Sequence, residues 1–338
     1  MQIAAAVCVP CRNEARLLPN LLDALAAQRG AGPFVLCLLY DGCSDASADV
    51  VAARSKQLPF RVITADIAAG APNAGLARGR AMALGLDLLG DRPGAIIVST
   101  DADSVPASNW LASNLAALEV ADVAAGRIMR EPGFPSPLQD RVEAYLDSLH
   151  MLRRKIDPLP WEAPATHHYT SGASLGFRLG AYRSLGGFDP LPSAEDARMV
   201  DTAHRAGLRV RHDDAIRVTT SARRVGRAVG GLADHLRDID VGATVPMMAD
   251  PDDVVWRYVR QAAARVAWDD IETGYPALAK LLDTDVDHVL AAAGRAVNAA
   301  AFAAIVVPEP PSGERLVMLD QAEQTLARLH GGPRMLAA

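Results

Sequence analysis

Short apolar runs alternate with helical patterns over the first 130 residues, and this alternation restricts the fold more than any other feature of the sequence. Apolar runs at Ile3–Val9 and Phe34–Tyr40 each precede a segment with helical spacing of its apolar residues. The pattern continues through Phe60–Thr64, a helix expected over Gly75–Leu89 and the run Ala95–Thr100. Strand–helix repeats of this length are typical of βαβ units, which build a mainly parallel sheet flanked by helices. We therefore expect an α/β, Rossmann-like fold.

The rest of the chain differs from this pattern. Prolines surround one amphipathic helical pattern at Leu138–Lys155, which indicates an inserted helical or lid segment. Beyond residue 224 the pattern is helical only, and Val289–Val307 is expected to form one buried helix. We therefore predict an α/β domain over 1–224, made of 1–130, the inserted segment 131–170 and 171–224, followed by an α-helical C-terminal region over 225–338.

Composition and charge restrict the class of partner. The 338 residues carry a net charge of −6, whereas nucleic-acid binding needs a clustered cationic surface, so we expect no nucleic-acid partner. The first ten residues lack the basic start and cleavage site of a signal peptide, and the four cysteines are scattered. We expect a cytoplasmic protein, and peripheral association with a membrane stays open.

The cysteines and one acidic run have alternative readings as metal or redox motifs. Cys8 and Cys11 have the spacing of a thioredoxin-type pair, but Cys8 lies inside an expected strand and not at a helix N-terminus. A zinc site with Cys37 and Cys43 would lack the usual second close pair. The run Asp283–Asp287 lacks the glycine and glutamate of a calcium loop, so we interpret it as a helix cap.

Two carboxylates, Asp101 and Asp103, follow the apolar run at Ala95–Thr100. In an extended segment, side chains two residues apart point the same way. Ligands of open α/β sheets bind at the carboxyl ends of the strands, and two hard oxygen ligands there suit Mg²⁺ or Mn²⁺ bridging phosphates. The alternative is a turn followed by a helix cap, because Asp and Ser favour both.

Six motifs, in order along the chain, carry a family resemblance. The earlier ones are Val9-Pro-Cys-Arg-Asn-Glu14, Tyr40-Asp-Gly-Cys-Ser-Asp45, Gly75-Leu-Ala-Arg-Gly-Arg80 and Asp101-Ala-Asp103. The later ones are Gly172-Ala-Ser-Leu-Gly-Phe-Arg178 and Gly186-Gly-Phe-Asp189, followed by Ser193-Ala-Glu-Asp196. Together they resemble family 2 glycosyltransferases with the GT-A fold, with a nucleotide-sugar half in 1–130 and an acceptor half in 171–224. The family often has Ser where Cys43 stands.

The resemblance implies a nucleoside-diphosphate-sugar donor in the first half. Asp41 would accept a hydrogen bond from the nucleobase, and Pro10 and Glu14 would flank the nucleoside. Arg80 would lie near the nucleotide, with Arg78 interpreted as a solvated neighbour.

The resemblance also implies how the diphosphate is held. Asp101 would lie near the ribose, and Asp103, with Asp101, would bind the divalent cation. Arg223 and Arg224 either clamp the diphosphate, which suits the bidentate geometry of arginine, or begin a surface helix. A third metal ligand stays open among His212, Asp213 and Asp214.

In the second half, the resemblance implies that Asp196 is the general base for the acceptor hydroxyl. Glu195 beside it is expected to support the base through like-charge repulsion. Gly172, Ala173 and Ser174 form the expected acceptor loop.

The sequence therefore predicts an inverting, metal-assisted glycosyltransferase that transfers a sugar to an unknown acceptor, lipid-linked or small. A homodimer stays open. One alternative is a nucleotidyltransferase that forms sugar nucleotides, but Cys11–Glu14 lacks the glycine-rich phosphate loop and lysine of that class. The other is a catalytically silent protein that binds nucleotide sugars and does not need Asp196.

Overall fold

The computed structural model describes residues 3–68, 70–227, 230–243, 245–311 and 313–331. The chain divides into two compact units. The first contains the residues up to Pro135, Ala163–Thr202 and Arg209–Asp238. The second contains Ser136–Glu162, Ala203–Leu208 and the residues from Ile239 onward.

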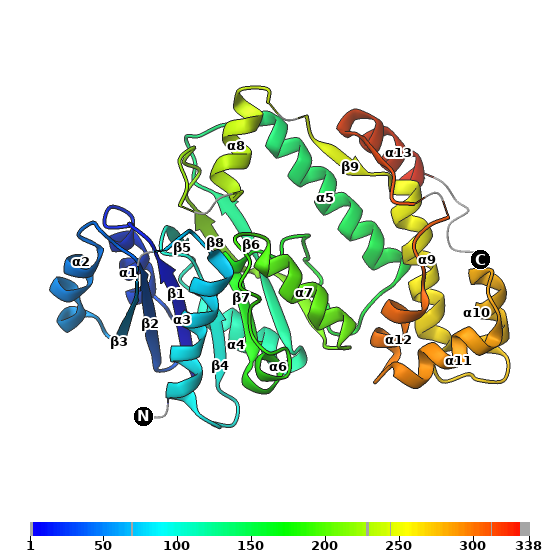
Figure 1. The fold of residues 1–338 in the computed structure, drawn as a ribbon, viewed down its shortest axis with the longest axis horizontal. Helices are drawn as coiled ribbons and strands as arrows, with labels where there is room; N and C mark the ends of the chain where they lie inside the picture. The colour runs from blue at the N-terminus through cyan, green and yellow to red at the C-terminus, as the bar shows by residue number, and fades with distance from the viewer. Residues whose placement is uncertain (1–2, 69, 228–229, 244, 312, 332–338) are drawn as a thin grey trace. The chain divides into compact units, whose positions relative to one another are not determined.

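The first unit is built on a mixed sheet, eight-stranded in its described residues, of order β3-β2-β1-β4-β7-β6-β8-β5 (Figure 1). The neighbours β3, β2, β1 and β4 run parallel, as do β6 and β8. By contrast, β7 is antiparallel to β4 and β6, and β5 is antiparallel to β8. The strands are β1 (Ala5–Cys11), β2 (Phe34–Asp41), β3 (Arg61–Ile67), β4 (Ile96–Ser99), β5 (Ser104–Pro106), β6 (Val123–Arg130), β7 (Leu175–Arg178) and β8 (Val210–Thr220).

Helices pack on this sheet through regularly spaced apolar side chains. In α1, Leu18, Leu21, Leu22 and Leu25 are all buried, which is the spacing of one helix face. Helix α3 packs on β1, β2 and β4, and α4 on β6, β7 and β8. The elements are α1 (Leu18–Ala26), α2 (Ser47–Arg54), η1 (Ser55–Gln57), α3 (Ala74–Leu89), α4 (Trp110–Val120), η2 (Gly172–Ser174) and α6 (Leu179–Ser184), with α7 (Glu195–Arg205) and α8 (Leu232–Asp240) beginning in this unit.

The parallel strands β1, β2 and β4 end at one edge of the sheet. The register pairs Cys11 with Tyr40 and Cys8 with Ser99, so the segments that follow these strands start side by side. This edge is where a doubly wound sheet places its ligands. The polar residues of four sequence motifs therefore meet there.

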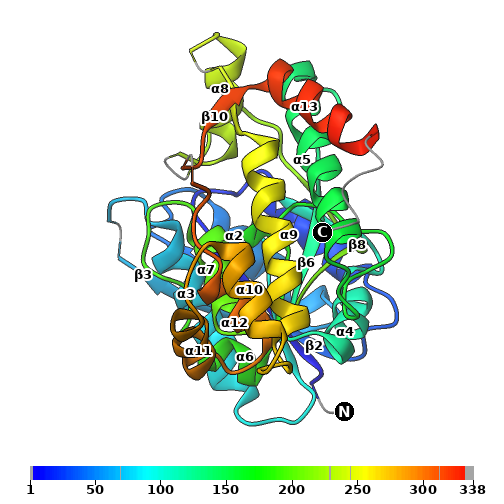
Figure 2. The ribbon, with the colours of Figure 1, turned by 90° about the vertical axis from the view of Figure 1, so that its right-hand side faces the viewer.

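The second unit is a helical assembly around α9, which contacts α5, α10, α12 and α13 (Figure 2). Two apolar clusters hold it together, one around Phe302 and Leu278, the other around Leu149 and Leu326. Its elements are α5 (Pro137–Ile156), β9 (Met247–Ala249), α9 (Pro251–Ala267), α10 (Gly274–Leu282), α11 (Val286–Arg295), α12 (Ala299–Val306), β10 (Leu316–Met318) and α13 (Leu319–Gly331).

Several local expectations are changed by the structure. The single helix expected over Val289–Val307 is two helices, because Asn298 accepts a hydrogen bond from the Ala301 N–H and starts α12. The region expected to be helical only also contains the antiparallel pair β9 and β10. The cap expected in Asp283–Asp287 is confirmed, since Asp285 accepts from the His288 N–H.

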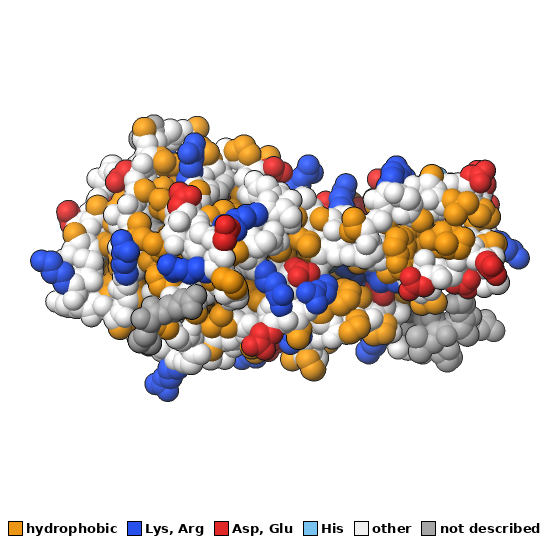
Figure 3. Space-filling model, turned by 90° about the horizontal axis from the view of Figure 1, so that it is seen from below, with side chains coloured by type: hydrophobic (Ala, Val, Ile, Leu, Met, Phe, Trp, Pro, Cys, Tyr) orange, Lys and Arg blue, Asp and Glu red, His pale blue; other side chains and the backbone are white. Residues whose placement is uncertain are grey.

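The helix expected in the inserted segment is α5, and it packs on α9 and α13 of the second unit. The domain limits given above stay a prediction. Among the described residues, no helix combines the length and the apolar character needed to cross a bilayer. On the face shown in Figure 3, Lys and Arg side chains are interspersed with Asp and Glu.

Candidate active site

A cavity of about 470 Å³ lies at the carboxyl ends of β1, β2 and β4, within the first unit. Most of the predicted site residues line it: Pro10, Glu14, Asp41, Asp101, Asp103, Ala173, Glu195, Asp196 and Arg223. Four others, Arg80, Arg224, Gly172 and Ser174, are described residues that do not line it. The structure therefore brings together carboxylates from both halves of the predicted domain.

Arg78 of α3 lies at the centre of the site. It is 6% exposed. Its Nε donates to Glu195 (3.0 Å), and its Nη1 donates to Asp101 (3.0 Å). The same Nη1 is 2.8 Å from Ser99 Oγ and 3.0 Å from the Gly172 carbonyl oxygen.

The interpretation of Arg78 as a solvated neighbour of Arg80 is therefore wrong. Arg80 is exposed and does not line the cavity. Side chains two positions apart in an α-helix point about 200° apart around its axis. When α3 directs Arg78 into the site, it therefore directs Arg80 away from it. The sequence motif contained both arginines, and only the helix orientation distinguishes them.

A second ion-pair network joins the start of the chain to the segment after β8. Glu14 is buried and accepts two hydrogen bonds from Arg223, at 2.7 and 2.5 Å. Arg223 Nη2 is also 3.1 Å from Asp103 Oδ2. Burial raises the pKa of Asp103 to about 7, and the charge of Asp101 adds to this rise, whereas Arg223 opposes it. The raised pKa means that the negative charge of Asp103 is unfavourable in this surrounding, so an additional cation beside it would be favourable.

Asp41, at the end of β2, is held by a residue that the sequence reasoning did not single out. Arg12 Nη1 lies 3.1 Å from Asp41 Oδ2, and its Nη2 donates to the Gly70 carbonyl at 2.9 Å. Arg12 and Asp41 both line the cavity. The motif Val9–Glu14 contained Arg12, but nothing in its spacing indicated this pairing.

Asp196 lies on the other side of the cavity, in the first turn of α7. It is partly exposed, and its Oδ2 accepts from the Gly172 N–H at 2.8 Å. Glu195 is buried; burial raises its pKa, the Arg78 charge lowers it and the Asp196 charge raises it. Ala194, just before the helix, has φ 60°, a conformation that non-glycine residues rarely adopt. The local chain thus buries Glu195 on Arg78 and leaves Asp196 at the cavity.

The expected acceptor loop has more than one role. Ala173 lines the cavity, whereas Ser174 is buried and accepts from the Trp110 indole N–H at 3.0 Å. A Cβ at Gly172 would lie 2.3 Å from Arg78 Cζ, so only glycine fits there. Ser174 therefore has a packing role and not the acceptor contact expected of it.

Arg224 and the three candidates for a third metal ligand all lie outside the cavity lining. Arg224 lies outside the cavity wall and donates to the carbonyls of Ala222 and Pro135. None of the candidates for a third metal ligand lines the cavity. Asp213 pairs with Arg211 and Asp214 with Arg127, which accounts for both carboxylates. His212 is buried beside the ring of His167.

The sequence division at residue 224 missed part of the cavity wall. Arg227 lines the cavity and donates to the Asn13 carbonyl at 3.2 Å. The wall continues through Gly230 and Gly231 to the first residues of α8, Leu232 and Ala233. The Gly-rich composition before α8 was the only sequence signal for this contribution.

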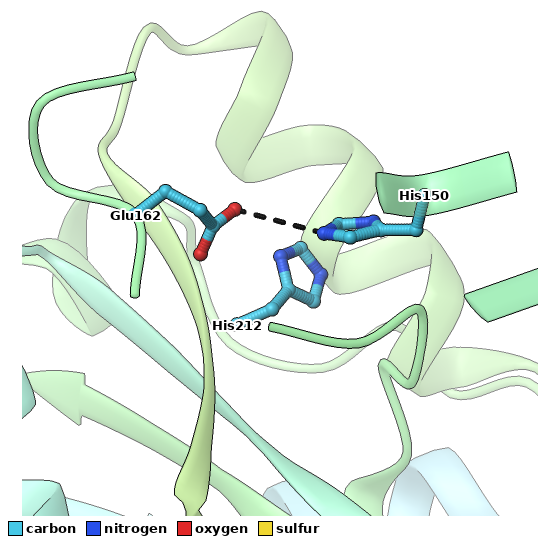
Figure 4. Close-up of side chains that lie close together, drawn as sticks. All are labelled: His150, Glu162 and His212. Carbon is cyan, nitrogen blue, oxygen red and sulfur yellow. Dashed lines mark ion pairs between the residues drawn. The ribbon is translucent and has the colours of Figure 1, made fainter. Parts of the chain in front are cut away.

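A separate titratable pair lies in the second unit. His150 of α5 and Glu162 approach to 3.8 Å between Nε2 and Oε2 (Figure 4). Arg154 Nη1 is also 3.8 Å from Glu162 Oε2. The charge of Glu162 is therefore matched by an arginine of its own unit.

Comparisons with known proteins bear on the family and the fold of the chain. The profile of the family described as "Glycosyl transferase family 2" matches residues 6–179, just over half of the chain. No curated protein matches the sequence closely enough to count as a relative. TarS 1–349 from S. aureus, solved with UDP-GlcNAc, shares 15% identity with a TM-score of 0.50, covering 83% of this chain and 72% of that chain. The mannosyltransferase PcManGT from Pyrobaculum calidifontis, solved with GDP-Man and Mn²⁺, shares 15% identity with a TM-score of 0.49, covering 98% of this chain and 86% of that chain.

The matched region runs from β1 into the start of α6 and includes every donor-side motif. The predicted GT-A-like fold, a mainly parallel sheet flanked by helices with a helical C-terminal region, is confirmed. The chain belongs to glycosyltransferase family 2, and it is an enzyme that transfers a sugar from a nucleotide sugar.

Proposed function

We propose that the protein is an inverting glycosyltransferase in which Asp196 is the general base. Asp196 would take the proton of the acceptor hydroxyl as its oxygen attacks the anomeric carbon and the nucleoside diphosphate leaves. One observation carries the proposal: Asp196 is partly exposed at the same cavity as Asp41, Asp101 and Asp103. A single displacement needs one base and no enzyme nucleophile, which agrees with this arrangement.

The residues at the carboxyl end of β4 fit a divalent cation, Mn²⁺ or Mg²⁺. Asp101 and Asp103 both line the cavity and offer hard oxygen ligands. The raised pKa of Asp103, caused by burial and by the charge of Asp101, indicates that this pair favours added positive charge. These two residues would hold the cation, and bound there it would neutralise charge on the departing diphosphate.

The donor we propose is a nucleoside-diphosphate sugar, the class to which the UDP-GlcNAc in the S. aureus TarS structure belongs. Asp41, which pairs with Arg12 and lines the cavity, would accept a hydrogen bond from the nucleobase. Arg223 forms ion pairs with Glu14 and Asp103, and it would contact the diphosphate once a divalent cation binds these carboxylates. Arg78 would hold the Asp101 carboxylate in position through the hydrogen bond from its Nη1.

The proposal can be tested in two stages. Thermal unfolding against nucleoside diphosphates and nucleotide sugars, with and without Mn²⁺, should identify the donor, since a ligand at about a hundred times its Kd stabilises the native state by about 2.7 kcal/mol. Asp103→Ala should lose the Mn²⁺-dependent part of the shift. If no nucleotide shifts the wild-type midpoint, the proposed donor site is wrong.

The second stage tests the base by release of nucleoside diphosphate in the presence of lipid-linked and small-molecule acceptors. Asp196→Asn should keep the nucleotide-induced shift and lose transfer, while Asp87→Asn, an exposed change on α3, should match wild type. Transfer by Asp196→Asn at the wild-type rate would contradict the assignment. Donor binding without transfer by the wild type, with every acceptor tried, would instead favour a silent nucleotide-sugar binder.

A further inference from the structure

Two cysteines lie together at the edge of the donor cavity. Cys11 is the last residue of β1 and lines the cavity, and Cys43 follows the neighbouring strand β2 by two residues. Cys43 Sγ donates to the Cys11 carbonyl at 3.2 Å and accepts from the Asn13 N–H at 3.4 Å. Both side chains also meet in one apolar cluster, of which Cys11 is a buried member and against which Cys43 packs.

We propose that Cys43 is a peroxide-sensitive thiol that forms a reversible disulfide with Cys11. The Cys43 sulfur lies against the backbone of Cys11 and packs on the same apolar cluster, so a disulfide between the two residues can form with small movements.

The two thiols are unequal in a way that suits this chemistry. The hydrogen bond from Cys11 lowers the pKa of Cys43 to about 7 against the opposing effect of burial, and the Asn13 N–H lowers it further. The same thiol–thiol hydrogen bond, together with burial, raises the pKa of Cys11. Cys43 is also partly exposed, whereas Cys11 is buried. Reactive thiols combine thiolate character with access, so Cys43 is the first to react and Cys11 is its resolving partner.

The reaction balances with hydrogen peroxide as the oxidant. The Cys43 thiolate attacks one peroxide oxygen, the O–O bond breaks, and a sulfenic acid forms as hydroxide leaves. The Cys11 sulfur then attacks the Cys43 sulfur, an S–S bond forms, and water leaves. The two cysteine sulfurs lose two electrons in total, both peroxide oxygens end as water, and a dithiol reductant reverses the change.

The disulfide would change the donor cavity. Forming the S–S bond draws Cys43 Sγ away from the Asn13 N–H, and Asn13 itself holds the loop after β2 by accepting from the Ser44 N–H at 2.7 Å. The neighbours of Cys11, Pro10 and Arg12, line the cavity, and Arg12 binds Asp41. We therefore expect weaker nucleotide binding in the oxidised protein; this effect rests on the proposed function, whereas the disulfide does not.

A second cysteine pair provides an internal control. Cys8 and Cys37 are directly opposite each other on the neighbouring strands β1 and β2. Both are fully buried at 0% exposure, so peroxide does not reach them in the native state. If proximity of the two cysteines were sufficient, both pairs would oxidise at similar rates. If access of peroxide to the sulfur is also needed, only the pair with the partly exposed Cys43 should oxidise.

The experiment treats the full-length protein with hydrogen peroxide and identifies disulfides by peptide mass mapping under non-reducing conditions. We expect a Cys11–Cys43 linkage that dithiothreitol reverses, and alkylation of Cys43 at least about tenfold faster than that of Cys8 or Cys37. Cys43→Ser should form no linkage, and Cys37→Ser should behave as wild type. Cys11→Ala should instead accumulate a sulfenic acid at Cys43 that dimedone traps.

Two results would overturn the proposal: no Cys11–Cys43 linkage in the wild type, or alkylation of Cys43 no faster than that of the buried pair. The midpoint shift caused by UDP or GDP with Mn²⁺ is measured on reduced and oxidised protein, and it should be smaller after oxidation. A shift absent from both forms would count against the proposed donor site and leave the disulfide result standing. An equal shift in both forms would refute the effect on binding.

Discussion

Replacing Arg78 by leucine is the sharpest test of how this site is built. The guanidinium is 6% exposed and Glu195 is 4% exposed, so the ion pair between them is buried. Arg78→Leu would leave Glu195 without its Nε partner and Asp101 without its Nη1 partner. Removing one partner of a buried ion pair costs about 3–5 kcal/mol, because the remaining charge stays buried and uncompensated.

A loss of this size is easily measured by denaturant unfolding or as a midpoint about 10 °C lower, since a domain of about 200 residues loses about 2–4 °C per kcal/mol. The matched control is Arg80→Leu on the same helix, whose exposed side chain should contribute within about 0.5 kcal/mol. Adding Glu195→Gln to Arg78→Leu should recover part of the lost stability, because the orphaned charge is removed.

The pH dependence gives an independent check. Burial already raises the pKa of Glu195 and Arg78 lowers it, so loss of Arg78 moves the folded-state pKa further up. A carboxyl whose folded pKa exceeds its unfolded value costs stability as pH rises through the unfolded pKa. The destabilisation by Arg78→Leu should therefore shrink as pH falls from the raised folded-state pKa of Glu195 toward its unfolded value. A loss below about 1 kcal/mol, or one equal to that of Arg80→Leu, would refute the reasoning.

Three other changes test separate features. Gly172→Ala places a Cβ 2.3 Å from Arg78 Cζ and should cost about 1–3 kcal/mol of unfolding free energy, whereas Gly180→Ala, with nothing within 4 Å, should not destabilise. Asp122→Asn should cost about 1 kcal/mol near neutral pH. Burial raises the pKa of Asp122, but the hydrogen bonds from Arg209 lower it more, so the folded-state pKa lies below the unfolded one. The stability that the ionised Asp122 contributes is therefore present above the unfolded pKa and is lost as pH falls through the folded pKa. A stability difference that does not change with pH would contradict this. Asn298→Ala removes the cap of α12 and should cost about 1 kcal/mol in chemical unfolding, with Asn298→Asp retaining most of the stability.

The elements that the sequence predicted are those with strong local patterns. The runs that became β1, β2 and β4 are apolar and end in polar residues, so both the strands and the position of Asp101 and Asp103 could be inferred from a few neighbouring residues. The strand β8 is less regular, because its register shifts opposite Gly126 and Arg127. Such irregularities depend on the partner strand and leave no local pattern.

The contacts that the sequence did not predict join distant residues. Arg78 and Glu195 are 117 residues apart, and Glu14 and Arg223 are 209 apart. Whether Arg78 or Arg80 points into the site depends on which face of α3 packs on the sheet. Neither arginine determines that packing. The strands β9 and β10 have three residues each, too few for a period-two pattern to distinguish them from loop.

Gly172 explains why the donor and base sides of this cavity depend on each other. Its carbonyl accepts from Arg78, which also holds Asp101, and its N–H donates to Asp196. The absence of a side chain lets the guanidinium approach Gly172 closely, so this one residue contacts both Arg78 and the proposed base Asp196. A shift of Arg78 would therefore move Asp101 and Asp196 together, whereas a change at Asp41 or Arg12 would act on the nucleobase end alone. Because transfer needs the acceptor oxygen and the anomeric carbon to be held in a near-attack geometry, Gly172 would couple the proposed base to the proposed donor site.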